Sequence, residues 1–274
     1  MTLDEIFDKA LGRLPMVPKV VQELLASFER DDSNVDAIVE QVSHDQVLSA
    51  KVLRLANSSR MSGGRPAKSI DDAVVRLGFD NLRMLVVAGG MAGMKVESSS
   101  FDRKAFWLHS FQTGNVARWL AKLAKLDANT AYTCGLLHNI GELLIHIALP
   151  QEMSKIDKMV VAGTDRVQVE NMVLGLNLAT VGGELARRWQ FPAEIQRAIT
   201  QHQNPAAFDE FEPYAGVVAL ANLLTAQFDA GLANADIAEV LPAKLLDKLA
   251  IDPAQLVGEL DAAREVCKGL DELL

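Results

Sequence analysis

Residues 136–150, with the sequence LLHNIGELLIHIALP, decide the fold class of this chain. Apolar side chains dominate the run from Leu136 to Leu149, and Pro150 follows, where it ends a helix. A run of this length is too long for a typical strand and matches a buried helix. No stretch of alternating β-branched residues competes with this interpretation. We therefore predict an all-α fold with a helix from Leu136 to Leu149.

Amphipathic stripes at helical spacing extend on both sides of this run. In one of them Val116, Leu120 and Leu123 recur at steps of four and three residues. Ser69 and Asp72 form a variant capping box, with Asp in place of the usual Glu, for a helix that ends at Gly78. Further helices are predicted within residues 17–28, 35–42, 45–57, 178–185, 195–199 and 217–228.

A polar break at residues 97–100, Glu-Ser-Ser-Ser, separates two groups of predicted helices. We predict an N-terminal helical lobe over residues 1–98 and a second helical lobe over residues 99–228. Residues 229–274 are acidic and rich in alanine, and Pro242 and Pro253 restart short helices there. This last part is predicted to be a C-terminal helical extension.

Composition excludes several classes of protein. Of the 274 residues 49% are hydrophobic and 23% are charged, which indicates a globular chain, and the net charge of -9 argues against nucleic acid as a partner. A DNA-binding helix-turn-helix within residues 35–57 is a weak alternative, because its second helix offers only Lys51 and Arg54. Cys134 and Cys267 lack metal or disulfide spacing. With no signal peptide pattern, and an apolar window at 84–94 too short to span a bilayer, we expect a soluble cytoplasmic protein that does not bind membranes.

The five histidines are the most informative polar residues of the chain. His44 stands at a predicted helix junction and His146 in an aliphatic helix, so we interpret both as bystanders of any site. His109 and His202 each share a helix face with apolar residues, and His138 directly follows two leucines. All three are predicted to point inward from different helices. They are either core histidines bonded to nearby carbonyl groups or members of one site.

Six segments of the chain carry a resemblance to a known family. They are LPMVPKVVQELL (14–25), VSHDQVLSAKVLRLANSS (42–59), SIDDAVVRLGFDNLR (69–83), FWLHS (106–110), CGLLHNIGELLI (134–145) and AITQHQNP (198–205). In their order and spacing the chain resembles the HDOD family, a divergent branch of the HD-superfamily metal-dependent phosphohydrolases, from about Leu14 to Phe228. The resemblance implies an all-helical, two-lobed HDOD domain with an HD-like helical bundle as the second lobe, and a role in bacterial signalling.

The resemblance also implies which residues would hold a metal ion. The first histidine ligand of the superfamily matches His109, the histidine of its His-Asp doublet matches His138, and one of two paired histidines matches His202. Three histidines and a water molecule can hold one zinc ion. The metal residues implied by the resemblance are therefore His109, His138 and His202, in a vestigial or at best mononuclear site.

Four other positions of the implied site have lost their ligands. Asn139 stands in place of the aspartate of the doublet, and Asn222 at about the place of the closing aspartate. Leu178 and Gln203 stand where histidines are expected. An amide oxygen is a weaker ligand than a carboxylate for hard divalent cations, so the two lost charges argue against a two-metal centre. Glu142 and Glu184 lie nearby, but we expect Glu142 to cap a helix and Glu184 to face solvent.

These losses favour a non-catalytic signalling or regulatory module, a pseudoenzyme, over an enzyme. Such a module would bind a signalling protein or a small ligand through its degenerate HD cleft, and we expect it to need no cofactor. The alternative is a metal-dependent phosphohydrolase, acting on phosphomonoesters or phosphodiesters, with a single Zn, Fe or Mn ion.

Overall fold

The computed structural model describes residues 2–11, 39–40, 42–43, 49–50, 52–53, 67–77, 96, 101–188 and 191–270. Every regular element within these ranges is helical, which confirms the predicted all-α fold. The predicted helices within residues 17–28, 35–42 and 45–57 lie outside the described residues or are described only in fragments. The same is true of His44 and of the apolar window 84–94.

Contacts divide the chain into two compact units. The first unit holds Met1–Leu14, Lys95–Arg188 and Ala193–Cys267, and the second holds Pro15–Met94, Trp189–Pro192 and Lys268–Leu274. The chain returns to the first unit at Lys95, whereas the sequence analysis placed a boundary between residues 98 and 99. The units differ from the predicted lobes at both ends, because the first fourteen residues and most of the predicted C-terminal extension belong to the first unit.

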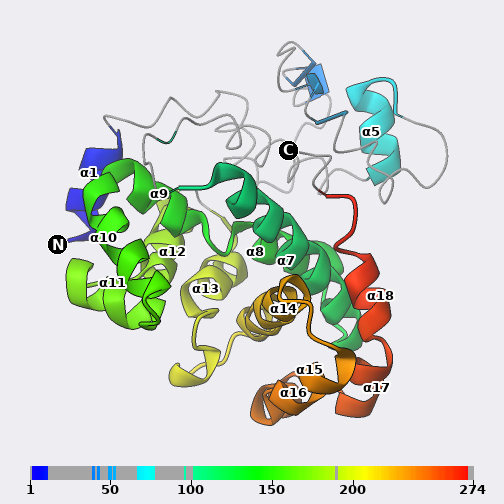
Figure 1. Ribbon diagram of the computed structural model, residues 1–274. Helices are drawn as coiled ribbons and strands as arrows, with labels where there is room; N and C mark the ends of the chain where they lie inside the picture. Colours follow the sequence, from blue (N-terminus) through cyan, green and yellow to red (C-terminus); the bar gives the residue numbers. More distant parts are fainter. Residues whose placement is uncertain are drawn as a thin grey trace. The chain divides into compact units, whose positions relative to one another are not determined.

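Fourteen helices are described in the first unit, thirteen α-helices and one short 3-10 helix (Figure 1). They are α1 (Leu3–Leu11), α7 (Arg103–Leu123), α8 (Ala128–Leu137), α9 (Ile140–Ala148), α10 (Pro150–Val161), α11 (Arg166–Leu174), α12 (Leu178–Arg188), α13 (Ala193–Gln201), η2 (Pro205–Ala207), α14 (Pro213–Asp229), α15 (Asn234–Val240), α16 (Ala243–Leu249), α17 (Pro253–Gly258) and α18 (Leu260–Glu265).

The long helices α7 and α14 form the centre of this unit, and α8 packs against both. Asp102 and Asp127 cap α7 and α8 by accepting hydrogen bonds from the backbone N–H groups of Ala105 and Thr130. The backbones of α7 and α8 meet closely, since a Cβ atom on Gly135 would lie 2.8 Å from the Cα atom of Gly114. Such small residues allow the two helices to bring their polar side chains near one another.

The C-terminal helices share one hydrophobic core with α7 and α14, so they are not a separate extension. Their apolar residues repeat at helical spacing and are buried, which removes their surface from water. This core is built from buried Val116, Ala117, Leu120, Ala121, Ala131, Val217, Leu220, Ala221, Leu224, Ile237, Leu246, Leu249, Ile251, Leu256 and Leu260.

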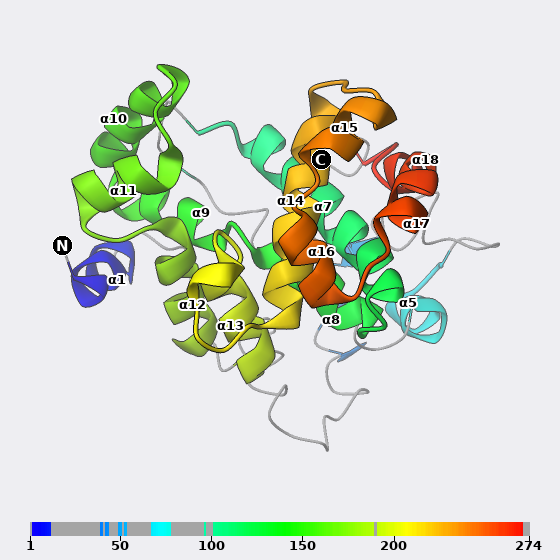
Figure 2. The same cartoon turned by 90° about the horizontal axis from the view of Figure 1, so that it is seen from below.

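Helix α1 lies against α9, although its sequence precedes the second unit. Its apolar face, Ile6, Phe7 and Ala10, is buried. The guanidinium of Arg188, at the end of α12, lies 4.0 Å from the centre of the Phe7 ring and pairs with Asp4 at 2.6 Å. Figure 2 shows α1 beside the sequence-distant α12.

The predicted helix over Leu136–Leu149 is wrong in one respect, because it is interrupted. Helix α8 ends at Leu137 and α9 begins at Ile140. Between them Asn139 leaves helical geometry, with φ -96° and ψ 12°. The apolar pattern continues across the break, so the periodicity alone did not reveal it.

In the second unit, helix α5 (Ile70–Leu77) follows the predicted capping box. The Asp72 N–H donates to Ser69 Oγ at 3.0 Å, as predicted. The Asp72 carboxylate accepts from the N–H of Lys68 at 2.8 Å, one residue before the position expected for a capping box. The helix ends at Leu77, directly before Gly78.

Candidate functional site: a histidine cluster around Asn222

Three histidines and one asparagine from four separate segments come together in the first unit. His109 lies on α7, His138 follows α8, His202 follows α13 and Asn222 lies on α14. The ring centres of His109 and His138 are 5.6 Å apart, and those of His138 and His202 are 5.2 Å apart. The structure thus brings together three histidines that the sequence predicted to point inward. We call these four residues the histidine cluster.

Backbone carbonyl groups fix the orientation of two of the rings. His138 Nδ1 lies 2.7 Å from the carbonyl oxygen of Gly135, and His202 Nδ1 lies 2.7 Å from that of Ile199. A carbonyl oxygen can only accept, so both Nδ1 atoms donate. Each neutral ring therefore carries its lone pair on Nε2. The buried His138 Nε2 has no hydrogen-bond partner among the described residues.

The third ring is bound differently. His109 Nε2 lies 2.7 Å from Asn222 Oδ1, so this nitrogen donates its proton to the amide oxygen. An Nε2 atom that carries a proton offers no lone pair to a metal ion. Asn222, at about the position of the lost closing aspartate, thus holds the Nε2–H group of His109 in a hydrogen bond.

Burial keeps the inner two rings uncharged. Burial lowers the pKa of His138 well below its ordinary value, and the neighbouring His202 and His109 act in the same direction. Burial lowers the pKa of His202 to about 4, opposed by its hydrogen bond to the Ile199 carbonyl. His138 is fully buried and His202 is 3% exposed. At neutral pH both rings are therefore neutral hydrogen-bond acceptors at Nε2.

The other implied site positions contribute no ligand. Asn139 is half-buried at the N-terminus of α9 and makes no capping hydrogen bond. Leu178 is buried at the start of α12, and its carbonyl oxygen lies 2.0 Å from the place a Cβ atom on Gly141 would take. Gln203 follows His202 and is half-buried, with its buried Oε1 lacking a hydrogen-bond partner in the described part of the chain.

The two nearby glutamates are engaged elsewhere. Glu142 was expected to cap a helix, but its Oε1 atom lies 3.4 Å from the Arg166 guanidinium. Glu184 pairs with Arg187 and Arg188 at 2.7 Å each, and these partners lower its pKa to about 2. Neither carboxylate compensates for the lost aspartates.

The donor set does not fit the metal centre that the resemblance implies. Within the described ranges, no group of three or more His, Cys, Asp or Glu side chains is arranged so that it could hold a metal ion. His138 and His202 present lone pairs, but His109 is turned to Asn222. A first shell without carboxylates also leaves the charge of a hard divalent cation unbalanced.

Comparison with known proteins shows the family. Residues 14–205 match the HDOD domain, and the chain belongs to the HDOD domain family. An uncharacterized protein of Treponema pallidum (strain Nichols) is 32% identical over 214 residues, which are 77% of this chain and 42% of that protein. The chain thus spans less than half of this relative's length.

Two solved structures are similar over nearly the whole chain. A candidate phosphohydrolase from Shewanella amazonensis SB2B is 34% identical with a TM-score of 0.81, and 98% of each chain is covered. An HDOD domain protein with unknown function from Geobacter sulfurreducens is 26% identical with a TM-score of 0.82, and 99% of this chain and 98% of that chain are covered. Both likenesses extend beyond the matched domain into the C-terminal helices.

Sequence reasoning missed a second polar cluster, in which His146 takes part. We call Glu142, His146, Asp157, Arg166 and Glu170 the Arg166 cluster. His146 is 2% exposed, and its Nε2 atom lies 3.7 Å from Asp157 Oδ2 and 3.9 Å from Glu142 Oε1. His146, interpreted from the sequence as a partly buried bystander, thus lies buried beside two carboxylates. The only signals in the sequence were the i,i+4 spacings of Glu142 with His146 and of Arg166 with Glu170.

No helix in the described segments is both long and apolar enough to cross a membrane.

Proposed function

We propose that this chain is a non-catalytic HDOD signalling or regulatory module. It would bind a protein partner or a small ligand through the surface around the histidine cluster. The signalling part of this proposal rests on the family, and the non-catalytic part rests on the residues of the cluster. We expect the module to act without a cofactor, in the cytoplasm, and without binding nucleic acid or membranes.

One observation carries the non-catalytic part. The amide oxygen of Asn222 lies 2.7 Å from His109 Nε2 and accepts its hydrogen bond. A carboxylate in its place would add a negative charge between two helices and could bind a metal ion directly. The amide instead satisfies the ring nitrogen with a neutral hydrogen bond, which stabilises the contact between α7 and α14 without any cation.

A second observation favours the alternative, a phosphohydrolase with a single metal ion. In metal sites a ligating histidine usually donates its other ring nitrogen to a carbonyl group or carboxylate. His138 and His202 have this arrangement, with both Nδ1 atoms held by backbone carbonyl groups. For this alternative to hold, His109 must leave Asn222 and carry its ring proton on Nδ1, so that Nε2 has a lone pair for a metal ion.

Activity assays separate the two proposals. Purified chain, prepared without chelators, is tested on phosphomonoester and phosphodiester substrates with added Zn, Mn or Fe. The non-catalytic proposal predicts no turnover above a buffer control. Metal-dependent turnover by the wild type that His138→Ala abolishes would establish the single-metal enzyme instead.

A variant that restores the two carboxylates tests directly whether their absence is the reason that no metal ion binds. Asn139→Asp combined with Asn222→Asp returns the two carboxylates at the implied positions. We expect this double variant to bind a divalent cation, seen as a rise in melting temperature on addition of Mn or Zn. The matched control, Asn139→Ala with Asn222→Ala, removes the same amides without adding charge and should show no rise. An equal rise in the wild type would contradict the proposal.

A further inference from the structure

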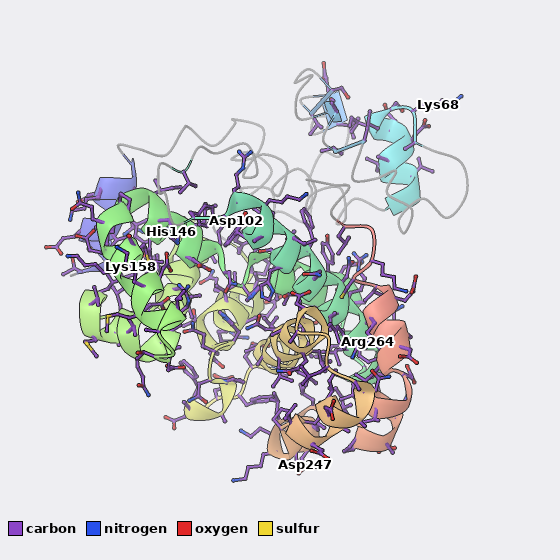
Figure 3. The ribbon with its side chains drawn as sticks, in the orientation of Figure 1. Lys68, Asp102, His146, Lys158, Asp247 and Arg264 are labelled. Atoms are coloured by element: carbon purple, nitrogen blue, oxygen red, sulfur yellow. The ribbon has the colours of Figure 1, made fainter. Side chains whose placement is uncertain are left out.

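The Arg166 cluster joins three consecutive helices of the first unit, α9, α10 and α11. Arg166 Nη2 lies 3.0 Å from Asp157 Oδ1, and Arg166 Nη1 lies 3.4 Å from Glu142 Oε1 and 3.5 Å from Glu170 Oε1. Glu142 belongs to α9, Asp157 to α10 and Glu170 to α11. Figure 3 labels His146 on α9, where its ring also packs 4.7 Å from the ring centre of Phe101.

The charges of this cluster do not balance when all three carboxyl groups are ionised. Arg166 supplies one positive charge. Burial lowers the pKa of His146 to about 4, so this ring is neutral at pH 7 even though Asp157 opposes the shift. Two negative charges in excess would then stand in a site where Glu170 is fully buried and Glu142 and Asp157 are 18% exposed. Buried unbalanced charge is costly, and a carboxyl group relieves it by keeping its proton.

Glu170 is best placed to keep that proton. Its side chain is fully buried, and its Oε1 atom has no hydrogen-bond partner among the described residues. Burial raises its pKa to about 7, although the Leu178 N–H and Arg166 favour the ionised form. Burial also raises the pKa of Glu142.

The same side chain fixes the beginning of the next helix. Glu170 Oε2 accepts a hydrogen bond from the backbone N–H of Leu178 at 3.0 Å, across the turn that starts at Gly175. Leu178 opens α12, and its carbonyl oxygen packs on Gly141 near the start of α9. Gly141 is three residues beyond His138 in the sequence. The beginning of α12 therefore depends on a carboxyl group whose charge the cluster does not balance.

We propose that the Arg166 cluster is a proton-dependent latch, which holds the beginning of α12 closed while Glu170 is protonated and releases it when Glu170 ionises. The groups that act on Glu170 are Arg166 from its own helix, Glu142 from α9 and the Leu178 N–H from α12. Asp157 from α10 pairs with Arg166, and His146 from α9 lies beside Asp157 and Glu142. This inference does not depend on what the histidine cluster binds.

The sign of the pH effect follows from linkage. In an opened state Glu170 is hydrated and titrates near its ordinary value of 4.5, whereas in the closed state it titrates at about 7. Between these values the opened state has lost the proton and the closed state keeps it. Opening therefore becomes easier as pH rises, by up to about tenfold per pH unit, and levels off above about pH 7.

Amide hydrogen exchange at Leu178 measures this opening. After correction for intrinsic exchange, we expect the protection of the Leu178 amide to fall by about tenfold or more from pH 5.5 to pH 7. In Glu170→Gln the amide oxygen still accepts from Leu178 but cannot ionise, so protection should no longer depend on pH. His146 is present in both proteins, so their difference isolates Glu170. Glu184→Gln, at a half-buried carboxylate of α12 that pairs with Arg187 and Arg188, is the matched control and should keep the wild-type trend.

A carboxyl NMR titration of the wild type provides a second test that does not need the variant to fold. We expect the Glu170 carboxyl group to titrate near pH 7. Titration near pH 4.5, equal Leu178 protection at both pH values, or the same pH trend in Glu170→Gln would each overturn the latch.

Discussion

The substitution His202→Asn removes a buried titratable ring and keeps its structural hydrogen bond. The Asn side-chain N–H group can replace His202 Nδ1 as the donor to the Ile199 carbonyl oxygen, which lies 2.7 Å away in the wild type. Asparagine does not titrate, so the variant loses the pH-dependent part of the contribution of His202 to stability. The packing contacts that the variant loses change the free energy of unfolding by the same amount at every pH.

The magnitude follows from the pKa of His202. The pKa of the ring is 6.5 in the unfolded chain, and burial lowers this pKa to about 4 in the folded protein. The neutral ring thus stabilises the fold above pH 6.5, and this contribution is lost as pH falls toward 4. At about 1.4 kcal/mol per pH unit the full loss is about 3 kcal/mol.

Urea unfolding at pH 7.5 and pH 4.5 measures this effect. We expect the free energy of unfolding of His202→Asn, relative to that of the wild type, to be about 2 to 3 kcal/mol higher at pH 4.5 than at pH 7.5. Gln203→Asn, a change in the neighbouring non-titrating side chain, should follow the wild type. The same stability difference at both pH values, or an NMR titration of His202 near 6.5, would refute the reasoning.

Three further predictions concern the framework around the cluster. Gly141→Ala should destabilise the fold by about 3 kcal/mol or prevent folding, because its Cβ atom would lie 2.0 Å from the Leu178 carbonyl oxygen. The control Gly258→Ala, whose Cβ atom would have nothing within 4 Å, should leave the thermal unfolding temperature nearly unchanged. Arg188→Gln should loosen α1 by about 1 kcal/mol, seen as faster hydrogen exchange in Leu3–Leu11 but not in α14, since it removes the contacts with Phe7 and Asp4. Asn222→Leu should leave His109 Nε2 without its acceptor and cost about 1 to 2 kcal/mol in urea unfolding, whereas exchange of exposed Gln255 for Ala should cost little.

The helical fold and the three inward histidines were predictable because both are local properties. The apolar period of Val116, Leu120 and Leu123 needs no partner to be recognised, and it placed a helix where α7 lies. His109 and His202 stand in such stripes, and the resemblance supplied the third member and the position of Asn222.

The break at Asn139, the position of α1 and the burial of Glu170 depend on which helices pack together. The apolar periodicity of the sequence does not contain that information. The break at Asn139 is hidden because apolar residues continue on both sides of it. The position of α1 depends on Arg188, which is 181 positions away from Phe7 in the sequence. Glu170 and Arg166 are spaced as an ordinary exposed helix pair, whereas in the fold Glu170 is fully buried and α10 packs against α11.

We propose above all that His109 is hydrogen-bonded to the Asn222 amide and that the histidine cluster does not hold a metal ion. Elemental analysis of untagged chain, purified without chelators, tests it most directly. We predict no stoichiometric Zn, Mn or Fe. One tightly held ion per chain, lost in His138→Ala, would contradict the claim.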